Sequence, residues 1–249
     1  MTESGEVLLE INGSVAVVTL NAPERRNALT PTMAAELIAT FDEVDGRADV
    51  GALVIKATGS SFCAGGDIAT LTSAGQDPAA ADAYERMGQI YDSFYRLGQV
   101  RVPTVAAVRG SAVGAGMNML LAADLRIVAS NARLLCGFLK RGMHPGGGHF
   151  VLLSRLIGRE AAAAMALFGE EINGARAAEL GLAWESVDGA AVEERALELA
   201  TRVADDAELA RAAVGNFRKE VVDGAVDWDV AMQHERPAQM WSMRRSADQ

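Results

Sequence analysis

Two glycine-rich loops stand where a predicted buried strand runs into a predicted helix. The first contains Ala64, Gly65, Gly66 and Asp67, and the second covers residues 110–116. Glycine lets the backbone approach a ligand closely, and N–H groups at a helix N-terminus attract negative charge. A single turn of this kind is more often only tight backbone geometry. Two of them together could form an oxyanion hole, which would stabilise negative charge developing on a carbonyl oxygen.

Two histidines bracket a third glycine-rich loop at residues 142–148. Histidine is the commonest general acid or base near neutral pH, so His144 and His149 are candidate catalytic bases. His149 is expected in the first turn of a helix, where the helix dipole disfavours protonation and favours a neutral base. The alternative is that both histidines serve packing or subunit contacts.

Other catalytic patterns are absent from these loops. No Gly-Lys-Ser/Thr phosphate loop, G-x-G-x-x-G fingerprint or G-x-S-x-G elbow occurs in them. Cys63 and Cys136 have no activating base nearby in sequence, so both are expected to be small buried hydrophobic residues. The three histidines lack metal-ligand spacing, so no metal site is predicted.

The composition limits the class of protein. The 249 residues carry 33 acidic and 23 basic side chains, a net charge of −10, and half are hydrophobic. That hydrophobic fraction excludes a disordered chain. The acidity argues against nucleic acid or an anionic membrane as the main partner.

The sequence also favours a cytoplasmic protein. Residues 1–10 contain no basic region of the kind that signal peptides have, and no stretch reaches the roughly 18 apolar residues of a membrane helix. Two cysteines far apart in sequence do not form a secreted disulfide framework, which indicates a reducing compartment.

Alternating strand and helix patterns predict an α/β core followed by a helical C-terminal region. A hairpin with an Asn12-Gly13 turn is expected at residues 7–20, and Thr30 and Pro31 open a helix. Further strands are expected at residues 52–58, 104–108, 125–128 and 183–187. The helix that Thr30 and Pro31 open is expected to span residues 31–44, and further helices are expected at 79–97, 115–122 and 150–156. Residues 228–245 could close the core or pack on a neighbouring subunit.

Several ordered motifs resemble the enoyl-CoA hydratase/isomerase (crotonase) family. They are PERRNAL (23–29), FCAGGDI (62–68), AAVRG (106–110), GAG (114–116), ADLRI (123–127) and GARAAELGLA (174–183). The resemblance implies a spiral of ββα turns over residues 1–190 and a helical trimerisation region over residues 191–249. It also implies a homotrimer or a dimer of trimers that binds acyl-CoA thioesters, with CoA as part of the substrate and no other cofactor.

The resemblance assigns roles within the loops. Gly66 and Ala115 would supply the two backbone N–H groups that hold the thioester oxygen as it becomes an enolate. The carbonyl of Ala64 would meet the adenine, and Arg25 would lie along the CoA phosphates, although Arg25 could equally be a solvated surface residue. The predicted substrate-binding residues are Arg25, Ala64, Gly65, Asp67, Ile68, Asn118 and Phe138.

The sequence departs from the family's hydratases at both catalytic glutamates, because Asn118 and Phe138 stand at those positions. Neither side chain can act as a general base, so efficient hydration is not expected. An isomerase needs one base, for which His144 and His149 are the candidates and Asp67 is a weaker one. The competing hypothesis is a catalytically silent acyl-CoA-binding or carrier protein.

Overall fold

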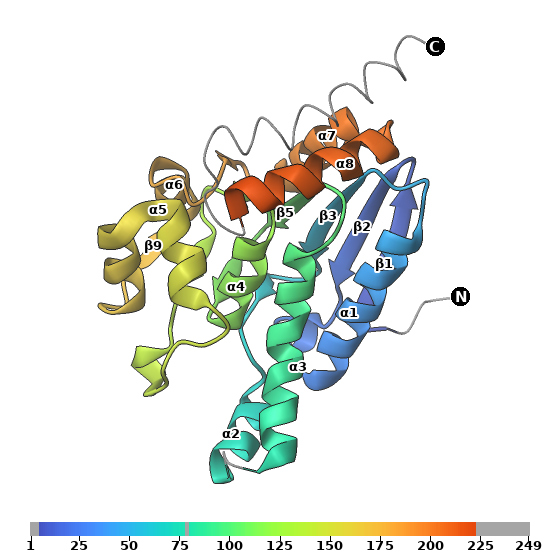
Figure 1. Cartoon of the computed structure of the whole chain (residues 1–249). Helices are drawn as coiled ribbons and strands as arrows, with labels where there is room; N and C mark the ends of the chain where they lie inside the picture. The colour runs from blue at the N-terminus through green and yellow to red at the C-terminus, as the bar shows by residue number, and fades with distance from the viewer. Residues whose placement is uncertain (1–4, 78–79, 223–249) are drawn as a thin grey trace, which may run out of the picture.

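Two mixed sheets form the framework of the computed structural model, which describes residues 5–77 and 80–222 (Figure 1). The larger sheet contains, in spatial order, β1 (Val7–Asn12), β2 (Val15–Leu20), β3 (Ala52–Ala57), β5 (Thr104–Val108), β7 (Leu125–Ala129) and β10 (Glu185–Val187). The smaller sheet contains β4 (Ser61–Cys63), β6 (Ser111–Val113), β8 (Arg133–Leu135) and β9 (Glu171–Asn173). In the larger sheet β1 pairs antiparallel with β2 and the other neighbours are parallel; in the smaller sheet only β8 and β9 are antiparallel.

The chain repeats one unit, in which a strand of the larger sheet, a strand of the smaller sheet and a helix follow each other. The units are β3-β4-α2, β5-β6-α4 and β7-β8-α5, which confirms the predicted spiral of ββα turns. The α-helices are α1 (Pro31–Gly46), α2 (Ile68–Gln76), α3 (Ala81–Gly98), α4 (Ala115–Ala122), α5 (His149–Ala166), α6 (Gly174–Glu179), α7 (Val192–Ala204) and α8 (Ala207–Phe217). Short helical turns are η1 (Pro23–Arg25), η2 (Leu139–Arg141) and η3 (Arg218–Val222).

Local sequence signals place the first elements correctly. Thr30 caps α1 by accepting a hydrogen bond from the N–H of Met33, and Pro31 occupies the first helical position. The β1–β2 hairpin forms as predicted, but its turn is Gly13-Ser14 rather than Asn12-Gly13. Asn12 pairs with Val15 across the ladder, which leaves only the next two residues to reverse the chain.

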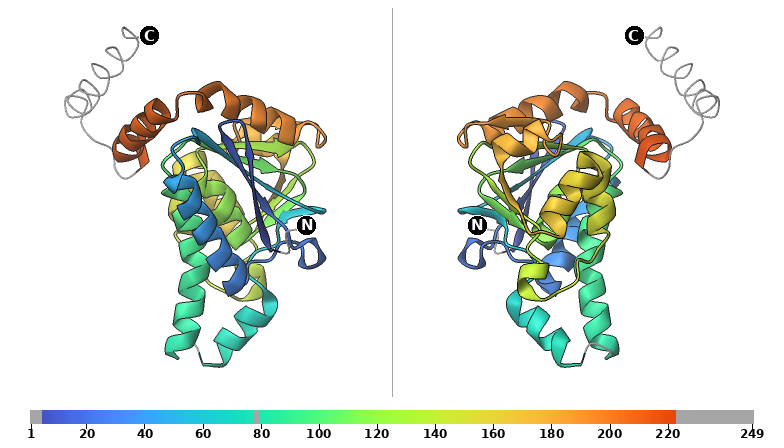
Figure 2. Two further views of the ribbon diagram at one scale, coloured as in Figure 1. Left: turned by 90° about the vertical axis from the view of Figure 1, so that its right-hand side faces the viewer. Right: turned by 90° about the vertical axis from the view of Figure 1, so that its left-hand side faces the viewer.

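The larger sheet is buried on both faces. Along β2, Ala16 and Val18 face the cluster that α1, α3 and α4 cover, whereas Val15 and Val17 face a second cluster under α7. The second cluster takes Val192, Ala196, Ala200 and Ala204 from α7, at helical spacing. These small side chains let α7 lie close to the sheet, as Figure 2 shows.

The sequence missed the elements that lack a periodic pattern. Strands β4, β6, β8 and β9 have three residues each, which is too short for alternation to be visible. Helix α2 lies in a segment for which the sequence predicted no element, and it has no buried residue. It projects from the body together with the start of α3 (Figure 1). Residues 228–245 lie outside the described part of the chain.

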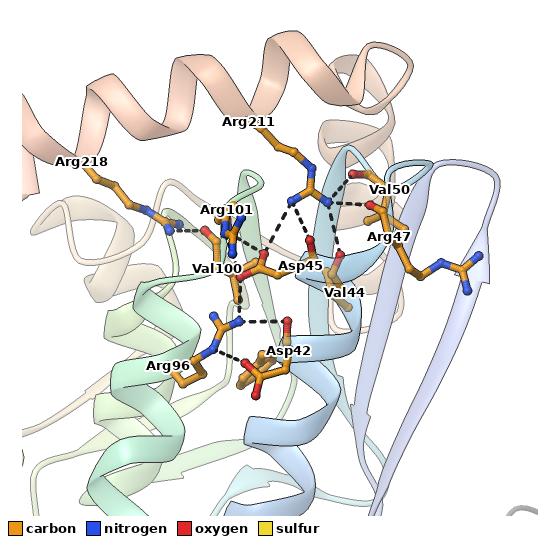
Figure 3. Close-up of polar contacts among 11 residues, drawn as sticks. Asp42, Val44, Asp45, Arg47, Val50, Arg96, Val100, Arg101, Arg211 and Arg218 are labelled. Carbon is orange, nitrogen blue, oxygen red and sulfur yellow. Dashed lines mark hydrogen bonds and ion pairs between the residues drawn. The ribbon is translucent and has the colours of Figure 1, made fainter.

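A polar network holds α8 against the core (Figure 3). The Arg211 guanidinium donates to the carbonyl oxygens of Val44, Arg47 and Val50, at 3.2, 2.7 and 3.2 Å. It also lies 3.7 Å from a carboxylate oxygen of Asp45, whose side chain is only 6% exposed. Carbonyls at the end of a helix lack intrahelical partners, so one cation joins the end of α1 to α8.

Replacing Arg211 with Met is therefore expected to lower the free energy of unfolding by about 2 kcal/mol, because buried carbonyl oxygens lose a charged donor. Urea denaturation measures this value. The control is Arg202→Met, since Arg202 is 57% exposed and pairs with Glu198 within α7. That change should stay within about 0.5 kcal/mol. Equal losses in both variants would contradict the role assigned to Arg211.

Candidate active site

The first two glycine-rich loops meet because β4 and β6 are parallel neighbours. Cys63 pairs with Ala112, so the loops that follow both strands leave the same edge of the smaller sheet. A Cβ built on Gly65 would lie 2.9 Å from the carbonyl oxygen of Val113 and 3.7 Å from the backbone nitrogen of Ala115. The φ angle of Gly65 is +100°. The junction of the loops thus requires glycine for space and for conformation.

Two backbone N–H groups at this junction are unpaired. The N–H of Leu29 donates to Gly65 at 2.7 Å and its carbonyl accepts from Asp67 at 2.9 Å, so the N–H of Gly66 between them points away from Leu29. Ala115 is the first residue of α4, where an N–H has no intrahelical acceptor. Within the described residues neither N–H donates to a protein group, which leaves both available to a ligand.

A buried asparagine, which the sequence motif contained without indicating its role, anchors the loop in front of this junction. Asn27 is fully buried, and its amide nitrogen donates to the carbonyl oxygens of Thr58 and Ser61, both at 2.9 Å. The neighbouring Arg26 carbonyl accepts from the N–H of Ala64 at 3.0 Å. These bonds hold the 23–29 motif against the first glycine-rich loop.

A cavity of about 610 Å³ opens beside the loops. Of the residues predicted from sequence, those lining it are Arg25, Ala64, Gly65, Gly66, Asp67, Ile68, Ala115, Phe138 and His144. Asn118 and His149 are not on its wall. The structure adds an apolar portion that contains Leu71, Met87, Ile90, Tyr91 and Met143. Met87, Ile90 and Tyr91 belong to the helix expected at residues 79–97, where their helical spacing in the sequence could have indicated a shared apolar face.

Two predicted site residues also have clear structural roles. The Asp67 carboxylate caps α2 by accepting hydrogen bonds from the N–H and hydroxyl of Thr70, at 3.0 and 3.2 Å. Ile68, the next residue, is 61% exposed at the cavity. These hydrogen bonds are enough to account for an aspartate at position 67 as a capping residue. The exposed Ile68 side chain, in contrast, is available for apolar contact with a bound molecule.

Basic side chains surround part of the cavity although the chain is acidic. The Arg25 guanidinium is engaged by the carboxylates of Glu6 and Glu24. Arg26, Lys140 and Arg141 line the cavity and are exposed, and no salt bridge to a described carboxylate is found for them. Lys140 is near enough to the Glu171 carboxylate to help lower its pKa, so among the described residues Arg26 and Arg141 are the cations least engaged by carboxylates at the cavity.

Asn118 and His149 form a buried hydrogen-bonded pair behind the cavity. The amide nitrogen of Asn118 donates to the carbonyl oxygen of Gly146 at 2.9 Å, and its amide oxygen lies 2.6 Å from Nδ1 of His149. Both side chains are 1% exposed. Burial lowers the pKa of His149 from 6.5 to about 4, so the imidazole is neutral at physiological pH.

An aromatic ring lies against His149. The rings of Phe138 and His149 meet edge to face with centroids 5.0 Å apart, and Phe138 also lines the cavity. His144 differs from His149, because it is exposed on the cavity wall and its Nδ1 lies 2.6 Å from the carbonyl oxygen of Pro145. The third loop is therefore flanked by one exposed histidine, His144, and one buried histidine, His149.

The cysteines do not form a nucleophilic site. Both are buried, and burial raises the pKa of each thiol to about 12. A thiol with that pKa remains protonated and unreactive, in agreement with the sequence prediction. Across residues 5–77 and 80–222, no cluster of His, Cys, Asp and Glu could hold a metal ion, and no helix is long and apolar enough to cross a membrane.

The sequence comparisons identify the family. The family model described as Enoyl-CoA hydratase/isomerase matches residues 10–243. The chain belongs to the enoyl-CoA hydratase/isomerase family. It is 39% identical over 236 residues to a Mycobacterium tuberculosis protein named "Probable enoyl-CoA hydratase EchA14", covering 94% of this chain and 89% of that protein. It is 33% identical over 205 residues to the 1,2-epoxyphenylacetyl-CoA isomerase of Escherichia coli K12, covering 80% of this chain and 76% of the isomerase.

The fold comparison agrees with this family. An enoyl-CoA hydratase from Polaromonas sp. JS666 superposes with a TM-score of 0.87 at 25% identity, covering 96% of this chain and 92% of that one. The two mixed sheets, the ββα spiral and the C-terminal helices are the crotonase fold.

Gly65→Ala is expected to destabilise this enoyl-CoA hydratase/isomerase family member and to abolish acyl-CoA binding, because the new methyl group would press on the Val113 carbonyl. The matched control is Gly13→Ala in the β1–β2 turn, where φ is +60° but nothing lies within 4 Å of the added Cβ. Gly13→Ala should cost about 1–2 kcal/mol from backbone conformation alone. Urea denaturation and calorimetric titration with acetyl-CoA separate the two effects. Normal binding by Gly65→Ala would contradict the tight junction.

The low pKa of His149 predicts acid sensitivity. The unfolded chain binds a proton on this side chain below pH 6.5, whereas the folded protein resists it until about pH 4. Stability from the neutral His149 is thus fully present above pH 6.5 and falls between pH 6.5 and about 4, by roughly 3 kcal/mol at most. His149→Gln should remove that part of the pH dependence in urea denaturation. An unchanged stability–pH curve in His149→Gln would show that His149 is not a neutral buried group.

Proposed function

We propose that this protein isomerises acyl-CoA thioesters through an enolate. The observation that supports the proposal is the pair of unpaired N–H groups, from Gly66 and Ala115, at the junction of two loops beside the cavity. When a base removes a proton next to the thioester carbonyl, negative charge moves onto the carbonyl oxygen. Two donors aimed at that oxygen lower the barrier, and one such donor is worth roughly 3–4 kcal/mol.

The choice of isomerisation over hydration rests on Asn118 and Phe138. By the family motifs these residues stand where hydratases have glutamates, and neither can activate a water molecule as a base. Isomerisation needs one base that takes a proton from one carbon of the acyl group and returns it to another. The candidate bases are His144 and His149. One relative is named an isomerase of an epoxide thioester and another a probable hydratase, so the choice of isomerisation is carried by Asn118 and Phe138.

The CoA portion would bind along the basic part of the cavity. We assign its phosphates to Arg26, Lys140 and Arg141, which are exposed there, while Arg25 would support the loop through Glu6 and Glu24. Ala64 would offer its carbonyl to the adenine. The acyl group would lie against the apolar portion with Met87, Ile90 and Met143, so an apolar acyl chain is proposed.

The family resemblance supports a proposal on assembly, and the cysteines support one on location. We propose a homotrimer or a dimer of trimers in the cytoplasm, with the helical region at residues 191–249 contributing to trimer contacts. The free thiols of Cys63 and Cys136 are compatible with a reducing compartment.

Removing one oxyanion donor tests the mechanism. Ala115→Pro deletes the N–H at the first position of α4, a position where proline is tolerated. The rate at which the enzyme exchanges the α-protons of acyl-CoA for deuterium in D₂O should fall by roughly 100- to 1000-fold. Mass spectrometry of butanoyl-CoA, octanoyl-CoA and phenylacetyl-CoA measures this exchange.

The matched control is Ala81→Pro, which puts proline at the first position of α3 behind Ala80, whose ψ of 136° suits a residue before proline. It should exchange at the wild-type rate. If the wild-type protein binds these thioesters but exchanges no proton in any of them, it is the catalytically silent acyl-CoA-binding protein and the isomerase proposal is wrong.

A further inference from the structure

The hydrogen bonds of Asn118 determine which nitrogen of His149 carries the proton. The Asn118 amide nitrogen donates to the Gly146 carbonyl at 2.9 Å, so its amide oxygen must be the atom that faces His149. That oxygen can only accept, which means that Nδ1 of His149, 2.6 Å away, is the donor. A neutral imidazole has one N–H, so Nε2 retains a bare lone pair.

The bare nitrogen has no partner. Nε2 of His149 is buried and forms no hydrogen bond to the residues described. An unsatisfied buried acceptor destabilises a folded protein, and an apolar residue in its place would avoid that cost. Such an atom next to a substrate cavity is a candidate for a catalytic role.

One aromatic ring contacts both His149 and the oxyanion junction. The Phe138 ring packs on His149 at 5.0 Å between centroids. The same ring also lies close to Gly114, because a Cβ built there would be 3.7 Å from Cζ of Phe138. Gly114 directly precedes Ala115, so the ring that covers part of His149 also borders the thioester site.

The segment that carries Phe138 lies between two glycines. Gly137 has φ +71° and Gly142 has φ +68°, and nothing lies within 4 Å of a Cβ built on Gly142. The Phe138 carbonyl accepts hydrogen bonds from the N–H groups of Arg141 and Met143, at 2.9 and 3.1 Å, so the backbone of this segment is held and the ring would move by rotation about its own side-chain torsions.

We propose that His149 is the general base, that Asn118 is a positioning residue that keeps its Nε2 bare, and that the Phe138 ring moves aside when acyl-CoA binds. The inference rests on the proposed isomerase function. In a β,γ-unsaturated acyl-CoA, Nε2 takes the α-proton, and the electrons of the broken C–H bond form an enolate conjugated with the β,γ double bond. The imidazolium then returns the proton to the γ-carbon as the double bond shifts. Uncovering His149 also relieves the burial that lowers its pKa, which makes it a better base at that moment.

His144 is the competing base, and two features favour His149. The ring of His144 is exposed to solvent, which can hydrogen-bond to its free nitrogen, whereas Nε2 of His149 is buried and has no partner among the described residues. Its Nδ1 is held only by the carbonyl of the adjacent Pro145, whereas Asn118 on another helix holds His149.

The first test needs no variant. In ¹⁵N-histidine-labelled wild-type protein, two-bond ¹H–¹⁵N correlation should show His149 with a protonated Nδ1 and a bare Nε2. Adding the acyl-CoA that exchanges fastest should shift the Nε2 resonance as Phe138 moves. A protonated Nε2, or an Nε2 resonance that the ligand leaves unchanged, would overturn the proposal.

The second test compares α-proton exchange in variants. His149→Gln should lower kcat by roughly 100-fold or more with little change in KM. Asn118→Leu should lower kcat less and should shift the NMR signals of His149 toward the other tautomer, which loss of packing alone would not do. Asn12→Leu makes the same change at an exposed position of β1 and should leave exchange intact.

The outcomes separate the two proposals. If Ala115→Pro abolishes exchange but His149→Gln does not, the enolate mechanism stands and the assignment of His149 is wrong. If only His144→Gln abolishes exchange, the enolate mechanism also stands and the assignment of His149 is wrong. Absence of exchange in the wild-type protein would overturn both proposals. If His149→Gln fails to fold, the tautomer measured in the wild-type protein still tests the assignment of His149.

Discussion

The parallel pairing of β4 with β6 is the constraint on which the site depends. These two short strands end side by side, so the loops after them converge, and the helices α2 and α4 start from that point. Glycine is needed where the loops touch, since Gly65 faces the Val113 carbonyl and a side chain on Gly116 would collide with the Cys63 carbonyl. Backbone N–H groups brought together this way are held rigidly, and rigid donors need no reorganisation when charge develops.

The charge distribution resolves an apparent conflict between an acidic chain and an anionic ligand. The net charge of −10 is a property of the whole surface, but a bound molecule responds mainly to charges within about 8–10 Å, because salt screens the rest. Most arginines are already engaged by carboxylates or carbonyls, as Arg96 and Arg211 are. The cations left at the cavity can therefore set the local potential while the overall charge stays negative.

In the proposed mechanism, the buried His149 would serve as a base in place of a carboxylate. A buried glutamate near the thioester would be charged and would need its own partners to offset desolvation. A neutral imidazole avoids that cost, and one amide group is sufficient to select its tautomer. Asn118 can do this because its orientation is set by Gly146.

The sequence by itself determined the family motifs, the strands of the larger sheet, α1, α4 and the two turns with the N–H donors. These depend on local signals, such as a cap, a glycine or an apolar run, that neighbouring residues supply. Only the tertiary structure decided what depends on distant partners: the three-residue strands, the pairing of Arg25 with Glu6, and the contact between Asn118 and His149, which are 31 residues apart. Spacing along the chain indicates which residues share an element, but the side chain that a buried group meets is set by how the elements pack.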